Sequence, residues 1–347
     1  MWRRPVLEVR SGRTDTNILP GLTGLWLSVS VTLNEGEESD EAEIEFVGPP
    51  SRVALPKKGD RYQILMGWAD EGLVDQGSYT VQKVSARGDP DSGERIVVTL
   101  RAAELDARAK AIGRKHYDKD ETLGARLQKV AGEAGASAVV DPELAALKLP
   151  YALRLDQSPI DFAREQIEAQ GGVLKVASGR WIATRRSEGK GGGGSALDAI
   201  EIKYRRNAAY DVEIDARGDY KACAGAYVDA RTAKRKLVKA VLEAGDGPTY
   251  VLPHPHKSEA EARKAAEAWL KTQLASTGEG SFDQPGLPKA RAGAQVQVSG
   301  FGAGIDGSWR AKRVHKIITA DAGFKTTVSV DAGKESKGAK RRSAKEK

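Results

Sequence analysis

The segment LRLDQSPIDFAREQIEAQGGVLKVASGRWIATRR, residues 153–186, predicts a short strand, a capped helix and a two-stranded hairpin in succession. Ser158 is a preferred N-cap residue, a proline follows it at the first helical position, and Asp161 lies three residues after the cap. A Gly-Gly pair ends the helix, and the apolar runs on either side of the later Ser-Gly pair have hairpin spacing. This order predicts a small α/β unit, with β-rich sequence on both sides.

The helix in this segment is amphipathic. Ile160, Ala163 and Ile167 lie on one stripe, with Phe162 beside it, whereas charged side chains occupy the opposite face. A helix of this kind buries its apolar stripe against a core. We therefore expect the helix to pack on the rest of the α/β unit.

Length and composition indicate a globular chain of two or three domains. The chain has 347 residues, of which 40% are hydrophobic and 30% are charged. No apolar run is long enough to cross a bilayer, and the N-terminus leads directly into the alternating run at 6–10 without the apolar core of a signal peptide. We expect no membrane span, no signal peptide and synthesis in the cytoplasm.

Cysteine content and charge exclude several classes of protein. Cys223 is the only cysteine, which rules out an internal disulfide framework or a thiol metal cluster. The net charge is +7, of which the segment 331–347 supplies +4. The rest of the chain is near balance, without the concentrated basic face typical of a nucleic-acid-binding domain.

Residues 1–105 predict a first small antiparallel β-barrel. Leu27, Val29, Val31 and Leu33 alternate with polar residues, as in a half-buried strand. Turn-forming residues separate further short runs at near-regular spacing. The strands are expected at residues 6–9, 25–33, 42–47, 62–68, 78–85 and 95–100.

Residues 106–188 predict an α/β insertion domain. The apolar residues between Leu123 and Ala134 have helical spacing, with Asp120 or Thr122 as the cap and Gly135 as the end. The Gly-rich run within 189–196 then predicts a flexible joint.

Strand patterns return in residues 197–330 and predict a second barrel. Strands are expected at 200–204, 210–216, 223–229 and 236–242 and in hairpins from 300 to 330. One helix, 258–274, interrupts them and starts with a capping box at Ser258. A disordered basic tail, 331–347, completes an α+β, mainly β chain in which two small antiparallel barrels flank the insertion.

Two segments resemble the late control protein D family of bacteriophages, which forms the tail or baseplate hub and is related to the hub part of type VI secretion spike proteins. The first is the D-x-S-x-x-D-F helix start at 156–162, followed by Gly-Gly and a hairpin. The second runs from Val296 through an Asp-Gly turn to a Gly-aromatic pair and Thr327. The motif residues are Ser158, Asp161, Phe162, Gly171, Gly172, Asp306, Gly307, Trp309, His315, Gly323 and Phe324.

The resemblance implies a structural protein of a phage tail or related contractile injection machine. Three subunits, each with two barrels, would form a pseudo-sixfold ring that joins the hexameric tail tube to the trimeric spike. Its partners would be tail-tube protein, the central spike, baseplate wedge proteins and the C-terminal end of the tape-measure protein, with DNA only as cargo. The implied location is the virion tail tip or baseplate, after assembly in the host cytoplasm.

Candidate chemistry in the sequence favours structural interpretations. The glycine run at 191–194 lacks the following Lys and Ser or Thr of a phosphate loop. His254 and His256 are too few for a zinc site, and we expect them in a loop before the helix. His116, expected in a polar turn, and His315, expected in a strand, have no nucleophile beside them.

Two rival functions remain open. Carboxylate pairs such as Glu37-Glu38 or Asp118-Asp120 could serve a tail-associated peptidoglycan hydrolase, although solvated charged loops are the usual role of such pairs. A nucleic-acid-binding barrel would need aromatic residues with arginine on one sheet face, and aromatic residues make up only 6% of the chain. We expect no enzymatic activity, no cofactor and no metal; the basic tail near Lys340 could contact DNA or an acidic partner.

Overall fold

The chain forms two compact units in the computed structural model. Unit 1 comprises Met1–Asp198, Asp283–Ala294 and Lys312–Val328, and unit 2 comprises Ala199–Phe282, Gln295–Ala311 and Ser329–Lys347. The expectation of a mainly β chain with a few helices is confirmed. The structure describes residues 3–36, 38–49, 51–52, 54–91, 93–102, 107–177, 179–185, 195–214, 222–229, 232, 234–241, 248–256, 258–275, 278–302 and 304–332.

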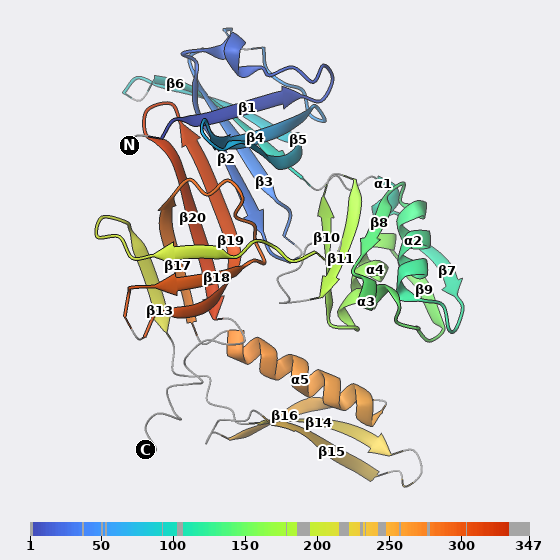
Figure 1. The fold of residues 1–347 in the computed structure, drawn as a ribbon. Coiled ribbons are helices and arrows are strands. Elements are labelled where there is room, and N and C mark those ends of the chain that lie inside the picture. The colour runs from blue at the N-terminus through green and yellow to red at the C-terminus, as the bar shows by residue number, and fades with distance from the viewer. Residues whose placement is uncertain are drawn as a thin grey trace. The chain divides into compact units, whose positions relative to one another are not determined.

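Unit 1 begins with six antiparallel strands whose order in the sheet is β1-β4-β5-β6-β3-β2 (Figure 1). A 3-10 helix, η1 (Leu19–Leu22), separates the first two. The alternation predicted for β2 is confirmed, because Val29, Val31 and Leu33 are buried. The strands are β1 (Pro5–Ser11), β2 (Trp26–Asn34), β3 (Glu41–Val47), β4 (Arg61–Trp68), β5 (Gly72–Asp89) and β6 (Gly93–Arg101).

A long hairpin near the C-terminus adds to this sheet. It consists of β19 (Gly307–Thr319) and β20 (Gly323–Ala332). The second half of β19, from Arg313, pairs antiparallel with β2 over seven residues. Val314 and Ile318 are buried on the same face as the apolar residues of β2, so this junction is part of the core of unit 1.

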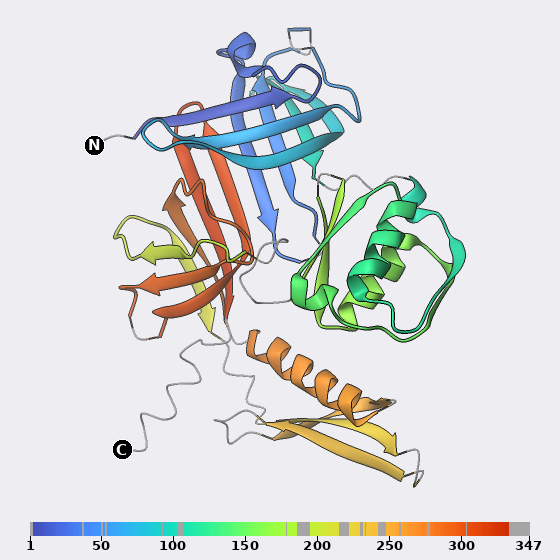
Figure 2. The ribbon, with the colours of Figure 1, turned by 45° about the vertical axis from the view of Figure 1, so that its right-hand side comes forward.

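Residues 107–177 and 179–185 of unit 1, here called the insertion, form an α/β unit with its own core (Figure 2). Its three-stranded sheet has the order β10-β11-β8, and a two-stranded sheet pairs β7 with β9. Two helices of the insertion, α2 and α4, bury their apolar faces in the core. The elements are α1 (Ala107–Lys110), β7 (Gly113–Tyr117), α2 (Leu123–Glu133), β8 (Ser137–Val140), α3 (Pro142–Ala145), β9 (Ala152–Gln157), α4 (Pro159–Glu168), β10 (Gly172–Ala177) and β11 (Arg180–Arg185).

Both predicted helix starts in the insertion are confirmed. The Ser158 hydroxyl accepts a hydrogen bond from the backbone N–H of Asp161, and the Thr122 hydroxyl accepts one from Ala125. Each cap satisfies an N–H group that has no partner inside its helix. Of the two cap candidates for α2, the structure therefore selects Thr122.

Unit 2 contains strands in the order β12-β18-β19-β20-β17-β13. They comprise β12 (Ile200–Lys203), β13 (Tyr210–Ile214), β17 (Gly278–Pro285) and β18 (Gln295–Ser299), together with parts of the long hairpin. If β12, β13, β17, β18, β19 and β20 are numbered 1 to 6 along the chain, their order in the sheet is 1-4-5-6-3-2. The strands β1–β6 have the same order. One direction differs: β12 runs parallel to β18, whereas β1 runs antiparallel to β4.

A separate three-stranded sheet, β15-β14-β16, lies in unit 2 beside helix α5 (Glu259–Ala275). It consists of β14 (Ala222–Asp229), β15 (Lys234–Val241) and β16 (Thr249–His256). Gly225 allows the helix to approach, because a Cβ there would lie 2.1 Å from the carbonyl oxygen of Ala262. The sequence placed β14 and β15 in the second barrel; that was wrong, because alternation reveals a strand but not its partner.

Three local expectations also need correction. His254 and His256 lie in β16 and not in a loop, and His116 lies in β7 and not in a turn. Strand β20 continues through Ala332, two residues into the region expected to be disordered. The glycine run at 191–194, the Glu37 of one carboxylate pair and the tail from 333 lie outside the described residues.

None of the helices in the described part of the chain combines the length and apolar character that a membrane crossing requires.

Candidate functional site

The first sequence motif contributes to the framework of the insertion. Ser158 caps α4 at 3.2 Å from the backbone nitrogen of Asp161, and Phe162 is buried in the core. Gly171 has a φ of +74°, which favours glycine at the end of the helix. A Cβ on Gly172 would come within 2.7 Å of a neighbouring side chain. These residues start, pack and end one helix.

The second motif divides between the two units. In unit 2, Asp306 accepts a hydrogen bond from the backbone N–H of Phe301 at 2.8 Å, immediately before Gly307 begins β19. The indole of Trp309 is buried and donates to the carbonyl oxygen of Ile305 at 2.8 Å. This part of the motif fixes the turn that leads into β19.

The remaining motif residues lie in unit 1. Nδ1 of His315 lies 2.9 Å from the hydroxyl oxygen of Thr32, and burial lowers the pKa of this imidazole. Gly323 has a φ of +85° in the turn of the β19–β20 hairpin. Phe324 is buried against Trp68, with ring centroids 5.3 Å apart. The motif residues hold strands and turns and do not converge on one reactive group.

A buried polar cluster that the sequence analysis missed lies in unit 1. Lys316 has no solvent exposure, and its Nζ donates to Oε1 of Gln76 at 2.7 Å and to the carbonyl oxygen of Pro288 at 2.8 Å. Arg291 donates to the same Gln76 oxygen at 2.8 Å. Burial, followed by the nearby guanidinium of Arg291, lowers the pKa of Lys316 to about 6.

The cluster fixes the segment Asp283–Ala294, here called the strap, onto the sheet of unit 1. Trp68 donates its indole N–H to the carbonyl oxygen of Gly286 at 2.9 Å, and Gln76 donates to that of Pro288 at 3.1 Å. A Cβ on Gly286 would lie 2.1 Å from the ring of Phe324. The signal in the sequence is the position of Lys316, which is in phase with the buried residues of β19.

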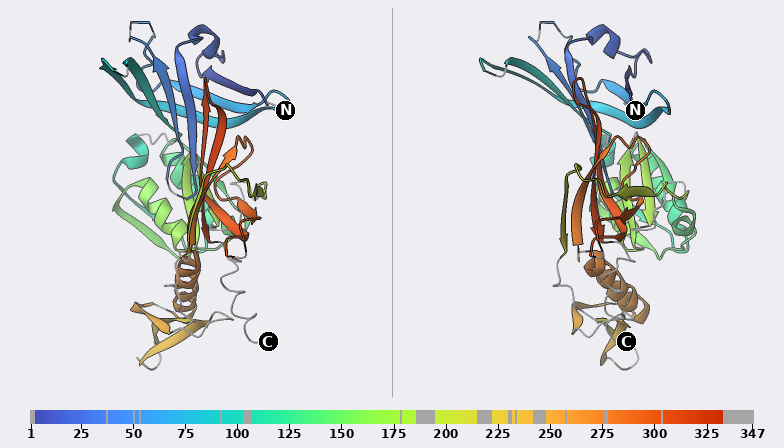
Figure 3. Two further views of the ribbon diagram at one scale, coloured as in Figure 1. Left: turned by 90° about the vertical axis from the view of Figure 1, so that its left-hand side faces the viewer. Right: turned by 60° about the vertical axis from the view of Figure 1, so that its left-hand side comes forward.

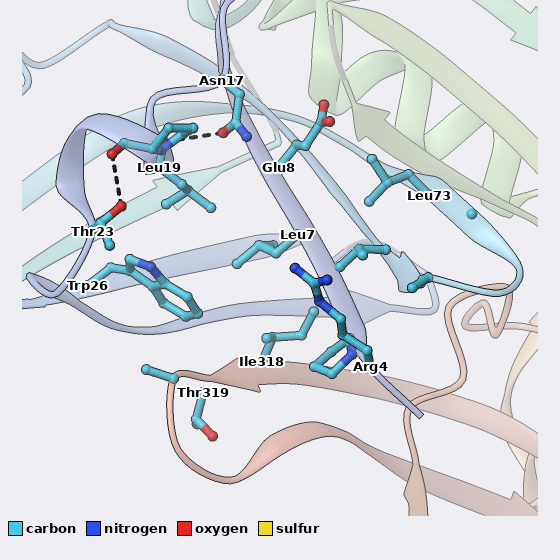
Figure 4. Close-up of a pocket in the computed structure, with 16 residues that line it drawn as sticks. Arg4, Leu7, Glu8, Asn17, Leu19, Thr23, Trp26, Leu73, Ile318 and Thr319 are labelled. Atoms are coloured by element: carbon cyan, nitrogen blue, oxygen red, sulfur yellow. Dashed lines mark hydrogen bonds between the residues drawn. The ribbon is translucent and has the colours of Figure 1, made fainter. Parts of the chain in front are cut away.

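A hollow of about 770 Å³ lies in unit 1 where the sheet would have to close to form a barrel (Figure 4). Leu7 of β1 and Ile318 of β19 both line it, although these strands lie at opposite ends of the order β1-β4-β5-β6-β3-β2-β19. Trp26 and Leu19 line it as well. The sheet is therefore curled, with its two ends facing across the hollow.

An aromatic cluster has the corresponding position in unit 2. Phe301 follows β18, and its ring packs against those of Tyr210 in β13 and Phe282 in β17. The ring centroids are 5.0 and 5.1 Å apart, respectively. The ring of Tyr204, which follows β12, also packs against Phe301, with ring centroids 5.3 Å apart. Residues from both ends of the strand order therefore meet, and this sheet is also curled. In neither sheet do the described strands close into a continuous ring of pairs.

The polar residues proposed for chemistry are dispersed. Within the described residues, no group of three or more histidine, cysteine or acidic side chains is arranged to hold a metal ion. His116 and the pair His254 and His256 lie in sheets of different units.

In sequence, the chain is similar to baseplate hub proteins of two phages. No protein-family model matches the chain. The chain is 28% identical to a probable baseplate hub protein of Escherichia phage P2 over 88% of both chains. It is 22% identical to a probable baseplate hub protein of Escherichia phage 186 over 62% of this chain and 55% of that protein.

Solved structures have the same fold at low sequence identity. A tail protein from Neisseria meningitidis MC58 gives a TM-score of 0.67 at 12% identity, over 94% of this chain and 96% of that one. A 43 kDa tail protein of prophage MuSo2 from Shewanella oneidensis gives a TM-score of 0.66 at 12% identity, over 94% of this chain and 97% of that one. An Escherichia coli component of the type VI secretion system gives a TM-score of 0.52 at 10% identity, over 95% of this chain and 77% of that one. The resemblance to tail hub proteins indicated by the two motifs is confirmed.

Proposed function

We propose that this chain is a structural hub protein of a phage tail or a related contractile injection machine. The similarity to two baseplate hub proteins supports this assignment. The single structural observation that carries it is the repeated strand order 1-4-5-6-3-2, once in β1–β6 and once in β12, β13 and β17–β20. We call these two sets of strands the first and second modules.

Each module is proposed to be a small open barrel. The hollow beside β1 and the aromatic cluster around Phe301 lie where the ends of each curled sheet approach one another. An unpaired strand edge is a site for pairing with another chain. Open barrels that pair along their edges can form a ring.

Two modules per chain suit a protein that joins two symmetries. Three copies present six modules of one strand order, which can match a sixfold tube, while the three insertions keep threefold symmetry for a trimeric spike. A head-to-tail contact whose rotation closes gives a ring and not a filament. The proposed assembly is therefore a homotrimer with a central channel.

The partners proposed for this ring are the tail-tube protein, the central spike, baseplate wedge proteins and the C-terminal end of the tape-measure protein. DNA would pass through the channel as cargo. The protein would act without catalysis, in the virion tail tip or baseplate, after assembly in the cytoplasm. The division of the motif residues between cores and turns supports a structural role.

Light scattering on the full chain, alone and mixed with its tube and spike proteins, tests the proposal. We expect a mass of three chains, either alone or in complexes with a three-chain hub. A strictly monomeric chain in the presence of both partners contradicts the proposed function.

A further inference from the structure

The junction between β2 and β19 has a counterpart that is left open in a single chain. Strand β19 pairs with β18 at Gln295–Val298, and beyond Arg310 the same edge becomes available and pairs with β2. In the first module, β5 is the strand that corresponds to β19. Its pairing with β4 ends at Thr80, opposite Arg61.

The second half of β5 therefore has one free edge. Residues from Lys83 to Asp89 pair with β6 on one side, and no described strand pairs with them on the other. Figures 1 and 3 show this end of the β5–β6 hairpin extending beyond the strands beside it. The seven residues 83–89 match in number the seven residues 313–319 that β19 offers to β2.

The strand of the second module that corresponds to β2 is β13, which also has a free edge. It pairs with β17 on one side and has no second partner among the described strands. Tyr210 and Ile214 are 49% and 53% exposed. In β2, by contrast, Val29 and Leu33 are at most 5% exposed, because β19 and its neighbours cover the core.

We propose that β13 of one copy pairs antiparallel with the second half of β5 of the next copy, which repeats between chains the β2–β19 junction within a chain. This inference rests on the proposed hub function and names the surface through which the ring closes. The occupant of each free edge is a second copy of this chain. The contact is head-to-tail, because the two edges belong to different modules.

The proposed register places Arg87 opposite Asp211. With Arg87 opposite Asp211, Val84 lies opposite Ile214 and Ala86 opposite Val212. Neither the guanidinium of Arg87 nor the carboxylate of Asp211 has an ion-pair partner among the described residues. Opposite charges directly across an antiparallel pair are favourable, and like charges are unfavourable.

The same register joins the two apolar faces. Val84 and Ala86 of β5 lie opposite the buried residues Val98 and Ile96 of β6, on the core face of the first module. Tyr210 of β13 lies opposite the buried Phe282 of β17, on the core face of the second. Pairing would therefore bury apolar side chains that one chain leaves exposed, next to cores that already exist.

Disulfide trapping tests the register. In a Cys223→Ala background, Ser85→Cys and Glu213→Cys place two cysteines directly opposite each other on the polar face. The matched control combines Ser85→Cys with Asp211→Cys, two residues away, where the Cα separation is too long for a disulfide. The full-length chain is oxidised with its tube and spike proteins present and is detected on a non-reducing gel.

We expect the Ser85→Cys and Glu213→Cys pair to give a closed covalent trimer, and the control to give monomers. Three outcomes overturn the inference and leave the hub function standing. The first is a three-chain particle in light scattering that does not form this disulfide. The others are a control that forms disulfides equally well, and complete oxidation that gives only dimers. A chain that remains monomeric with both partners contradicts the hub function and, with it, this inference.

A charge exchange gives a second measurement. We expect Arg87→Asp to raise the concentration at which half of the ring dissociates by about tenfold, because two carboxylates then face each other. Asp211→Arg should have a similar effect, and the double variant should recover most of the loss. If the two changes weaken ring assembly additively in the double variant, with no recovery, Arg87 and Asp211 do not face each other.

Discussion

Nζ of Lys316 lies 2.7 Å from Oε1 of Gln76, and the lysine is completely shielded from solvent. The same oxygen accepts from Arg291, and Pro288 supplies a second acceptor for the lysine. The strap that crosses the sheet of unit 1 is therefore held by side-chain bonds to its carbonyl groups. Its stability depends on a lysine whose pKa burial lowers to about 6.

Lys316→Met should make the stability of unit 1 less dependent on pH. Between pH 7 and 9 the folded lysine is mostly neutral, whereas an unfolded lysine, with an ordinary pKa near 10.5, is charged. The unfolded state binds more protons, so the free energy of unfolding of the wild type rises with pH, by up to about 1.4 kcal/mol per pH unit. Urea unfolding at pH 7, 8 and 9 should show a smaller rise in the variant.

The control for this experiment is Lys289→Met, which removes an exposed lysine from the same strap. It should keep the pH dependence of the wild type. An equal rise with pH in Lys316→Met and wild type would show that Lys316 is charged in the folded protein.

Gln76→Leu should destabilise unit 1 by about 2–3 kcal/mol, because it removes the acceptor that the buried amine of Lys316 and the partly buried guanidinium of Arg291 share. The amide of Gln76 also donates to the carbonyl oxygen of Pro288, so the change affects the strap directly. Denaturant midpoints measured by tryptophan fluorescence check the effect. Gln63→Leu, which removes an exposed hydrogen bond to Asp75, should cost less than about 0.5 kcal/mol; equal losses in the two variants would contradict the role given to the cluster.

Gly286→Ala should also loosen the strap. The added Cβ would lie 2.1 Å from Cδ1 of Phe324, and neither the aromatic ring nor the strap can move without disturbing the other contacts. Overpacking of this kind costs about 1–3 kcal/mol. In Gly132→Ala no atom lies within 4 Å of the new Cβ, and the helix α2 should gain up to about 1 kcal/mol. Thermal unfolding of both variants gives the comparison, and a Gly286→Ala protein as stable as the wild type would be incompatible with this packing.

Arg126→Met should destabilise the insertion. The guanidinium is fully buried and donates to the carbonyl oxygens of Asp118 and Pro150, each at 2.9 Å, and to Gln166. Removing one partner of a buried charged network costs about 3–5 kcal/mol. Amide hydrogen exchange should increase in α2 and α4 and stay unchanged in β14–β16. Unchanged exchange in the helices would show that these bonds contribute little.

The sequence predicted local structure well where the deciding contacts are local. Ser158 and Thr122 act within their own helices, so the caps could be identified from short spacing rules. The polar cluster could not, because Gln76 and Lys316 are 240 residues apart and meet only through the strand order.

The pairing of strands was also beyond the sequence. Strands were predicted at 223–229 and 236–242, as one was at β2. The structure has strands there, β14 and β15, but they form a separate sheet beside α5. A period of two reports which face is buried and contains no information on the neighbouring strand. The repeated strand order, on which the proposed function rests, therefore required the structure.

Electron cryomicroscopy of the assembled tail tip tests the central claim most directly. The account predicts three copies of this chain around the axis, with six β modules in one ring between the tube and the spike. A single copy, six copies, or three copies placed away from the axis would contradict it.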